Sequence, residues 1–557
     1  MAYRILLLSS AANGVTQRAT LALRRSGRET IIEVVADAAE MDAALARHDN
    51  IDAIICPYLV TKIPAHITRR WPTVIIHPGV VGDRGPSSLD YAITEGEKVW
   101  GATALMAVEE MDAGPVVATR NYAMPEDTKS AIYNGVGADA AIACILEAAD
   151  HLEDPNFTPV PQDEHPRLLA HARTRPALRQ RDRAIDWTKP AKDILPAIHA
   201  ADGSPGVLTT LTGHQVYVHD AHLSGINAPN AEPGTIIGRT QHYLRIACGS
   251  GSLLIGHLRA RDEQLPPVKA PATEVLARLG EPEVPDHGTD PAWSDIRYHR
   301  SGDIGTVEFF AYAGAFSVDF SLRLAAAIRT AAAADTRVLI IAGTGPAFSN
   351  GLHLGSIELA HNPDAEGWAS IHAINRVCAE IANCDQVTIA AVQASAGAGG
   401  VMLALTADFV VAAERAILNP HYKTMGLTGS ELHTATLPRR VGHTIAEELL
   451  TAAQPIDTGT ALDIGLIDEI RPDRNFAHSV HRFARLYSEG PLYQAALYGK
   501  EERRRAIGNV EVILAQETSR MYPCFFHDAM GHREKRQSFI RKSPNTRSRS
   551  EHMPLAG

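Results

Sequence analysis

The chain has 557 residues, too many for one compact core and typical of three or four domains. Hydrophobic residues make up 45% and charged residues 21%, an ordinary balance for a soluble globular protein. The formal net charge of −11 argues against a general binder of nucleic acid or membrane surfaces, so we expect small molecules as substrates.

The opening residues and the cysteines indicate the compartment. The start MAYRILLLSSAANG has only a short apolar stretch and no cleavage pattern, which predicts a buried strand and not a signal peptide. No apolar run approaches the roughly 18 residues of a spanning helix. The six cysteines are scattered and form no Cys-x-x-Cys pair. We therefore expect a cytoplasmic protein with reduced, mostly buried thiols and no metal site.

Residues 1–165 alternate short apolar runs with amphipathic stretches. The runs end in turn-forming residues and read YRILLLSS, TIIEVVA, IDAIICP and PTVIIHP. Amphipathic segments such as MDAALARHD separate them. This rhythm predicts an α/β domain built on a parallel sheet.

Three further regions follow. Beyond a Pro- and charge-rich linker, residues 180–265 show one helix and several short strands, which predicts a small β-barrel (OB-like) domain. Residues 290–520 begin a second α/β unit with strands such as DIGTVEFF and TRVLIIAG, and helical patterns dominate after about residue 440. Residues 521–557 form a basic tail, which we interpret either as disordered or as a clamp for phosphates. The fold class is multidomain α/β.

Two polar residues mark a candidate site in the first domain. His77 ends the strand TVIIH, and Asp112 lies in an Asp-Ala-Gly-Pro turn after another strand-like segment. Polar residues at the carboxyl ends of parallel strands face the crevice where such folds bind ligands. A satisfied histidine and a turn aspartate would explain each residue taken alone.

As a pattern, these segments resemble the folate-dependent formyltransferases, in particular methionyl-tRNA formyltransferase, and RDRAIDW onward resembles that family's C-terminal barrel domain. The resemblance implies a 10-formyltetrahydrofolate donor, with Asp112 orienting and charging the catalytic His77 or relaying a proton through water. The family's asparagine is replaced by Ile75. An amide that polarises the oxyanion is typically worth ~10²–10³ in rate, so its loss suggests another acceptor, such as a thiol.

Two Gly-rich turns follow strands in the second half, in VLIIAGTGPAFSNGLHLGSIE and TIAAVQASAGAGGVMLALTAD. Such turns aim backbone N–H groups at one spot. Together with the later ILNPHY, they resemble the crotonase (enoyl-CoA hydratase/isomerase) superfamily. The resemblance implies a thioester oxyanion hole formed by the N–H groups of Leu352 and Gly399.

The two hydratase carboxylates of that superfamily are missing, because their positions hold Met402 and Tyr422. Ordinary hydration is therefore not expected. Tyr422 and Glu431, nine residues apart, remain near the expected thioester as catalytic candidates. A charge on a surface loop is the alternative interpretation of Glu431.

The two modules in this order resemble the HypX (HoxX) family of hydrogenase-maturation proteins. That resemblance implies formyl transfer to coenzyme A, then decarbonylation of formyl-CoA to CO, which becomes the carbonyl ligand of the iron in [NiFe]-hydrogenase. Partners would be other maturation proteins or the precursor of the hydrogenase large subunit.

Coenzyme A would serve both sites. Its candidate contacts are Ser9, Asn13 and Gln17 after the first strand, and Arg536 and Arg541 in the basic tail. Closing a βα turn is the alternative role of the first three. Two other functions stay open: a formyltransferase for another acceptor with a non-catalytic crotonase module, and a non-catalytic assembly protein.

Overall fold

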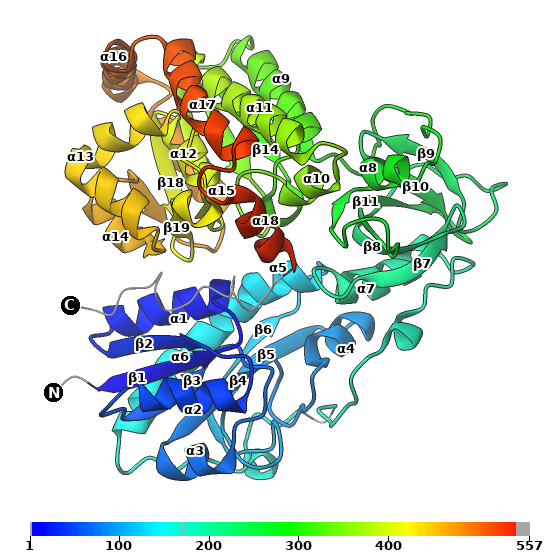
Figure 1. Cartoon of the computed structure of the whole chain (residues 1–557), viewed down its shortest axis with the longest axis vertical. Helices are drawn as coiled ribbons and strands as arrows, with labels where there is room; N and C mark the ends of the chain where they lie inside the picture. The colour runs from blue at the N-terminus through cyan, green and yellow to red at the C-terminus, as the bar shows by residue number, and fades with distance from the viewer. Residues whose placement is uncertain (1–2, 170, 542–557) are drawn as a thin grey trace. The chain divides into compact units, whose positions relative to one another are not determined.

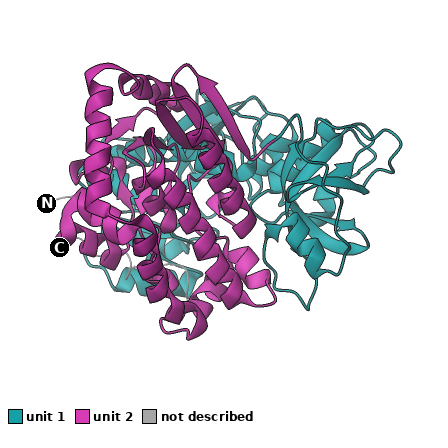
Figure 2. Ribbon diagram, turned by 90° about the horizontal axis from the view of Figure 1, so that it is seen from above, with its two compact units in different colours: residues 1–293, 542–557 teal, residues 294–541 magenta. Residues whose placement is uncertain are grey.

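The computed structural model describes residues 3–169 and 171–541 and divides the chain into two compact units (Figures 1 and 2). Unit 1 contains the described residues up to Trp293, and unit 2 runs from Ser294 to Arg541. All six cysteines are buried and unpaired, as their scattered positions predicted.

The first part of unit 1 is a six-stranded sheet in the order β2-β1-β3-β4-β5-β6. Its strands are β1 (Arg4–Ser9), β2 (Glu29–Val34), β3 (Ala53–Cys56), β4 (Thr73–His77), β5 (Val99–Met106) and β6 (Val116–Ala123). The first four are parallel, as predicted. β5 and β6 are antiparallel to their neighbours, which corrects the expectation of a wholly parallel sheet. The short link between β5 and β6 can join only antiparallel strands.

Helices cover both faces of this sheet. The helices are α1 (Gly14–Arg25), α2 (Ala38–Ala46), α3 (Ala65–Arg70), α4 (Ser88–Thr94), α5 (Lys129–Asn134) and α6 (Val136–Glu153). α1 and α6 pack with Ile5 and Leu7 of β1, while α2 and α3 pack with Leu6 and Leu8. Both faces of β1 are therefore buried, which explains its continuous apolar run.

By length and composition alone, the segment Lys129–Glu153 could cross a membrane. Core helices of globular proteins pass the same test. Within this segment α6 packs an Ala-rich face, including Ala141 and Ala148, against the sheet. Its hydropathy is therefore weak evidence for membrane insertion.

The second part of unit 1 is an antiparallel sheet in the order β7-β8-β11-β10-β9, with β12 paired to β11. Its elements are α7 (Ala191–Ala201), β7 (Val207–Leu211), β8 (His214–Leu223), β9 (Ile236–Thr240), β10 (Tyr243–Ala247), β11 (Ser252–Ala260), β12 (Ala270–Pro271) and α8 (Ala272–Arg278). Among the described residues, β7 and β9 are the two edge strands of this sheet and do not pair with each other. The predicted small barrel is therefore not closed by strand pairing.

Unit 2 is built on a sheet in the order β13-β14-β15-β16-β18-β21, with a small sheet β17-β19-β20 beside it. The strands are β13 (Ile296–Ser301), β14 (Ile304–Phe309), β15 (Val338–Gly343), β16 (Val387–Val392), β17 (Ala396–Gly397), β18 (Phe409–Ala413), β19 (Ile417–Asn419), β20 (Ile456–Asp457) and β21 (Glu469–Arg471). All neighbours in the main sheet are parallel except β13 and β14.

The helices of unit 2 extend further than the sequence predicted. They are α9 (Val318–Ala332), α10 (Leu354–Leu359), α11 (Pro363–Asn383), α12 (Gly399–Leu405), α13 (His433–Ala452), α14 (Thr458–Asp463), α15 (Phe476–Leu486), α16 (Gly490–Ile507), α17 (Val510–Phe526) and α18 (His532–Arg541). α17 crosses the predicted boundary at residue 521, and α18 follows it. Residues 521–541 therefore belong to unit 2 and are not a disordered tail. The rest of that predicted region lies outside the described residues.

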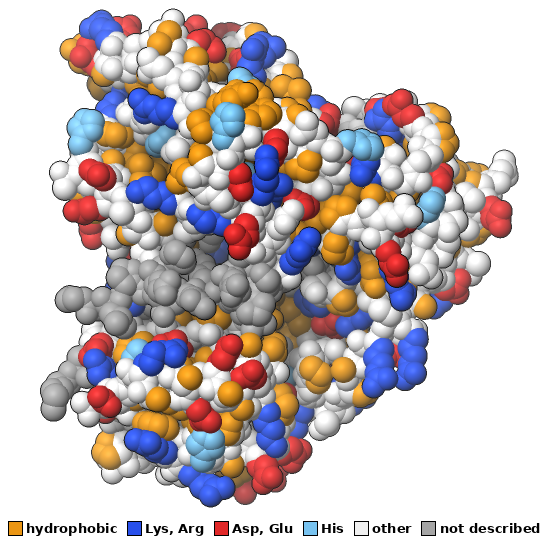
Figure 3. Space-filling model, in the orientation of Figure 1, with side chains coloured by type: hydrophobic (Ala, Val, Ile, Leu, Met, Phe, Trp, Pro, Cys, Tyr) orange, Lys and Arg blue, Asp and Glu red, His pale blue; other side chains and the backbone are white. Residues whose placement is uncertain are grey.

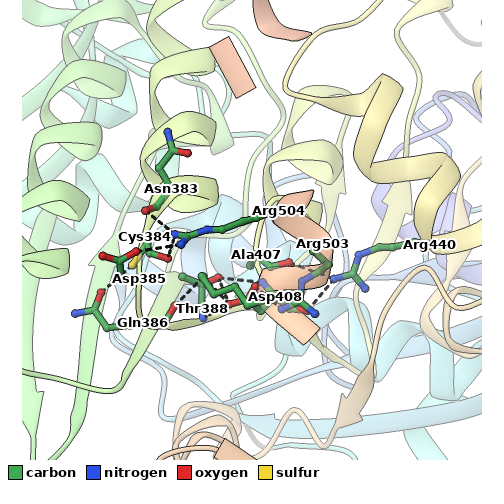
Figure 4. A network of polar contacts seen from close by, with 11 residues as sticks. Asn383, Cys384, Asp385, Gln386, Thr388, Ala407, Asp408, Arg440, Arg503 and Arg504 are labelled. Carbon is green, nitrogen blue, oxygen red and sulfur yellow. Dashed lines mark hydrogen bonds and ion pairs between the residues drawn. The ribbon is translucent and has the colours of Figure 1, made fainter. Parts of the chain in front are cut away.

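A buried ionic network attaches α16 to the sheet (Figure 4). The carboxylate of Asp408, just before β18, accepts hydrogen bonds from Lys500 Nζ at 2.8 Å and Arg503 Nη2 at 2.5 Å. It also accepts the backbone N–H of Thr388 in β16 at 2.8 Å. Burial alone would raise the pKa of Asp408, but the two cations outweigh burial and lower it. The network thus connects α16 with two central strands.

On the face shown in Figure 3, acidic and basic side chains are interspersed over unit 1 and over unit 2. This mixture agrees with the modest net charge of the chain.

Candidate active sites of the two units

In unit 1, a pocket of about 260 Å³ opens at the carboxyl end of β4. Its wall includes both residues of the predicted pair, His77 and Asp112. The structure therefore brings together two side chains that are 35 positions apart in the sequence. Apolar side chains form most of the remaining wall, as in most pockets that bind small molecules.

His77 lies between two carboxylates. Its Nδ1 atom is 3.6 Å from Asp112 Oδ1, and its Nε2 atom is 3.1 Å from Asp83 Oδ2. The ring is 3% exposed and Asp83 is 1% exposed, so both interactions lie in a medium that screens charge weakly. Each carboxylate faces one ring nitrogen, and together they fix the orientation of the ring.

Asp83 was not among the site residues predicted from the sequence. It lies in the Gly-Asp-Arg-Gly turn that follows His77, and no expected motif marked it. Its spacing of six residues from His77 was visible, but only the return of this turn toward β4 shows which ring nitrogen it contacts.

The turn that carries Asp112 is held from several sides. Asp112 has a left-handed φ of 58°, and its Oδ2 atom accepts the backbone N–H of Gly85 at 3.2 Å. Gln162 donates to the carbonyl oxygens of Asp112 and Gly114. The side chain is thus oriented toward His77 by contacts from distant parts of unit 1.

Ile75 is in the pocket wall, two residues before His77 on the same strand. An aliphatic side chain stands where the formyltransferase pattern has an amide, and it has no group that could polarise an oxyanion.

The polar residues after β1 mainly stabilise the turn into α1. Ser9 is fully buried, and its hydroxyl bonds to the carbonyl oxygens of Ala11 and Tyr58. Asn13 caps α1 by accepting the N–H of Thr16, and Gln17 Nε2 donates to the carbonyl of Ala12. Ser9 therefore closes the βα turn, and its buried side chain is not exposed to a ligand. Asn13 and Gln17 are partly exposed, and their contact with coenzyme A stays a prediction.

In unit 2 the two Gly-rich turns lie side by side. The N–H of Gly397 donates to the carbonyl of Ser349 at 2.8 Å, and the N–H of Phe348 donates to that of Ser395 at 2.9 Å. A Cβ added to Gly351 would lie 3.4 Å from the Gly399 nitrogen. Gly399 opens α12, where N–H groups have no partner within the helix. The backbone of Leu352 follows directly on Gly351, so the two predicted oxyanion-hole residues are neighbours in space.

Tyr422 and Glu431 form a buried pair. The phenol donates a hydrogen bond to Glu431 Oε2 at 2.8 Å, and the two residues are 5% and 2% exposed. A Cβ on Gly399 would clash with Glu431 Oε1, so this carboxylate lies directly against the expected oxyanion hole. The interpretation of Glu431 as a surface charge is therefore wrong.

Burial dominates the protonation of this pair. It raises the pKa of Glu431, although the hydrogen bonds from Tyr422 and Ser430 oppose the change. Burial and the neighbouring Glu431 carboxylate raise the pKa of Tyr422 well above its usual value. Both groups are thus biased toward holding their protons. For Glu431 this shift is toward neutral pH, where a proton-transferring group is most effective.

Two residues around this pair were not identified from the sequence. Asn375 on α11 accepts the N–H of Glu431 through Oδ1 at 3.0 Å. Glu517 on α17 accepts the N–H of Leu432 at 2.9 Å. Both lie more than 55 positions from Glu431, and only tertiary folding brings them to it.

The two predicted arginines of the basic region have different surroundings. Arg536 is 2% exposed, and its Nε atom donates to Glu358 at 2.9 Å. This burial contradicts its assignment as a phosphate contact. Arg541 is the exposed last residue of α18, and its contact with phosphates stays a prediction.

A polar cluster in the second part of unit 1 consists of Asp220, His242 and His257. Their potential ligand atoms lie close enough together to hold a metal ion. In the structure the two Asp220 oxygens lie 2.8 Å from His222 Nε2 and 2.9 Å from His257 Nδ1. Hydrogen bonds within the cluster thus engage both carboxylate oxygens.

The comparison with protein families gives three matches along the chain. Residues 14–147 match the formyl transferase model, residues 177–272 the formyl transferase C-terminal domain, and residues 312–545 the enoyl-CoA hydratase/isomerase model. Both resemblances drawn from the motifs are therefore confirmed.

Individual proteins match in the same way. The chain is 35% identical to hydrogenase maturation factor HoxX of Bradyrhizobium diazoefficiens over 98% of this chain and 96% of that protein. It is 33% identical to methionyl-tRNA formyltransferase of Roseiflexus castenholzii, over 33% of this chain and 56% of that protein. The crystal structure of HypX from Aquifex aeolicus in complex with tetrahydrofolic acid aligns with a TM-score of 0.92 and 32% identity. That alignment covers 100% of this chain and 99% of the other.

Proposed function

The chain belongs to the HoxX/HypX family of hydrogenase maturation factors, and from that premise we propose a two-step reaction. In the first step a formyl group passes from 10-formyltetrahydrofolate to coenzyme A. In the second step formyl-CoA is cleaved to CO and coenzyme A. The observation that carries the second step is the buried hydrogen bond between Tyr422 and Glu431 beside Gly399.

The first step uses His77. N10 of the folate loses the formyl carbon and must gain a proton, while the thiol of coenzyme A loses one as its sulfur bonds to that carbon. The imidazole carries the proton between these events, and Asp83 and Asp112 hold its two nitrogens in place. A formyl transferase model that matches residues 14–147 and a tetrahydrofolate-bound relative support folate as the donor.

Ile75 favours a thiol as the acceptor. Without an amide to polarise the oxyanion, the site gives less help to a weak nucleophile. A thiolate is intrinsically more nucleophilic than a protonated amine and needs less assistance. The enoyl-CoA hydratase/isomerase module on the same chain supports coenzyme A as that thiol.

The second step moves one proton from carbon to sulfur. A base takes the formyl proton, the C–S bond breaks to release CO, and the thiolate leaving group gains a proton. Formyl-CoA has no α-carbon, so enolate formation is not possible. Glu431 and Tyr422 share these proton transfers, while the N–H groups of Leu352 and Gly399 hold the carbonyl oxygen.

Membership of the family suggests how the product would be used. CO would become the carbonyl ligand of the iron in [NiFe]-hydrogenase, and the reaction would take place in the cytoplasm. The partner would be a maturation protein or the precursor of the hydrogenase large subunit.

The direct test mixes the purified protein with 10-formyltetrahydrofolate and coenzyme A, and follows CO by its binding to deoxyhaemoglobin. We expect CO only when both substrates are present. Formyl-CoA that accumulates without CO would limit the chemistry to unit 1. A donor that is consumed without coenzyme A would indicate another acceptor, and a donor that is not consumed at all would favour a non-catalytic assembly role.

A further inference from the structure

The turn that carries Glu431 has an unusual backbone. Glu431 and Leu432 both have φ values of 60°, in the left-handed region that residues with a side chain rarely occupy. Two such residues in sequence are strained and remain in place only where their surroundings determine the conformation. The hydrogen bonds around the turn show which groups fix its conformation.

Glu517 on α17 makes the most contacts with this segment. Its Oε2 atom accepts the N–H of Leu432 at 2.9 Å. Its Oε1 atom accepts the N–H of Thr434 at 2.8 Å and the hydroxyl of Thr434 at 2.6 Å. Because α13 begins at His433, the carboxylate lies at the N-terminus of that helix, where a negative charge is stabilised.

Asn375 on α11 holds the other side of the turn. Its Oδ1 atom accepts the N–H of Glu431 and the hydroxyl of Ser430, both at 3.0 Å. Its Nδ2 atom donates to the hydroxyl of Thr518, the residue after Glu517. α11 and α17 thus hold the turn together and are joined to each other at the same place.

α17 is itself held in position. The helix that precedes it, α16, carries Lys500 and Arg503, which bind the buried Asp408 (Figure 4). Near the other end of α17, Phe525 packs so closely on Gly367 of α11 that a Cβ there would clash with its ring. Glu517 therefore projects from a rigid support.

We propose that Glu517 is a positioning residue for the thioester-cleaving site of unit 2. It keeps Leu432 and Thr434 in place, so that Glu431 stays against Tyr422 and Gly399. This inference rests on the proposed function, because it assigns Glu517 a role in CO release.

The negative charge of Glu517 also acts on Glu431. The titratable groups that face Glu431 are Tyr422 from its own loop, His433 from α13, Cys378 from α11 and Glu517 from α17. Burial raises the pKa of Glu431 most, and the charge of Glu517 raises it to a smaller extent, whereas Tyr422, Ser430 and His433 lower it. Without the Glu517 charge, Glu431 would ionise at a lower pH.

The test compares Glu517→Gln with Glu511→Gln, an exposed residue on the same helix. A glutamine offers one carbonyl oxygen, so its NH2 group would meet the N–H of Leu432 or Thr434, donor against donor. With formyl-CoA supplied directly, we expect kcat for CO release to fall about 10–100-fold in Glu517→Gln, as for other residues that orient an active group. KM should stay unchanged, and the limb of the pH profile set by Glu431 should move to lower pH.

Equal kcat and equal pH profiles in the two variants would overturn the positioning role. If Glu517→Gln does not fold, as judged by circular dichroism, Thr434→Val replaces it, because it removes only the hydroxyl that bonds to Glu517. That variant should lose activity in the same direction, about 3–10-fold for one buried hydrogen bond; an unchanged rate would overturn the inference. A wild-type protein that releases no CO from formyl-CoA would instead overturn the proposed function and, with it, this role.

Discussion

The two candidate sites place their charges in opposite ways. In unit 1, His77 stands between the carboxylates of Asp83 and Asp112, and each ring nitrogen faces one of them. In unit 2, the Glu431 carboxylate is buried beside a phenol and near Glu517, and these surroundings favour its neutral form. A proton-transferring group can thus be placed between charged partners, as in unit 1, or buried away from water, as in unit 2.

The sites also differ in how they are held. His77 ends a central strand, so the sheet positions it. Glu431 lies on a strained turn that depends on side chains from α11 and α17. We expect the unit 2 site to be the more sensitive of the two to substitutions outside the reacting groups.

The largest effects should separate the two sites completely. Glu431→Gln should lower CO release from formyl-CoA by about 10³-fold, because a proton-transferring group typically contributes 10²–10⁴. Consumption of 10-formyltetrahydrofolate should stay normal. His77→Ala should lose consumption of 10-formyltetrahydrofolate but keep CO release from formyl-CoA. Both rates can be measured for each variant.

Glu447→Gln is a matched control for the first variant, since it removes the charge of an exposed glutamate on α13. A Glu431→Gln protein that still releases CO at the wild-type rate would contradict the assigned role.

Next in size is a loss of stability confined to unit 2. Asp408→Asn removes one partner of a buried ionic network and leaves Lys500 without its counter-charge. Such changes cost about 3–5 kcal/mol. Thermal unfolding followed by calorimetry should show a lower transition for unit 2, while folate consumption at low temperature persists.

The control for this change is Asp385→Asn, whose carboxylate pairs with Arg504 but is largely exposed. It should cost less than about 1 kcal/mol. Equal losses in the two variants would show that the Asp408 network does not stabilise the unit.

A smaller effect is expected on the unit 1 side. Asp83→Asn keeps an oxygen near His77 Nε2 but removes the negative charge. Formyl transfer should slow by about 10–100-fold, with retained folate binding, by analogy with the partners that orient metal-binding histidines. Single-turnover kinetics would measure the rate of formyl transfer, and a folate titration would measure binding. Asp127→Asn, at an exposed position, is the control. An unchanged rate would mean that Asp112 alone is enough to orient the ring.

The smallest effect concerns pH and stability. Because burial raises the pKa of folded Glu431 above its unfolded value, the native state binds more protons between the two values. Its contribution to stability is therefore present at low pH and is lost as pH rises through the folded pKa. Urea titrations at several pH values should show a steeper fall in unfolding free energy for wild type than for Glu431→Gln. Identical slopes would contradict a raised pKa.

Local sequence patterns were sufficient for much of the fold. The apolar runs of β1 to β4, the strand that ends at His77 and the two Gly-rich turns all lie where the sequence predicted them. Strand periodicity and turn residues act over a few positions, so they can be identified without the tertiary structure. The two modules were indicated by the resemblance of the segments around His77, Asp112, Leu352 and Gly399 to known families.

The tertiary structure alone decided the surroundings of each site. The antiparallel pairing of β5 and β6, the burial of Arg536 against Glu358, and the meeting of Asn375 and Glu517 with the Glu431 turn depend on contacts between distant segments. The sequence does not show whether a charged residue lies on the surface or in the core. Only packing removes the water around it, and that removal decides whether Glu431 is a surface charge or a buried acid beside Tyr422.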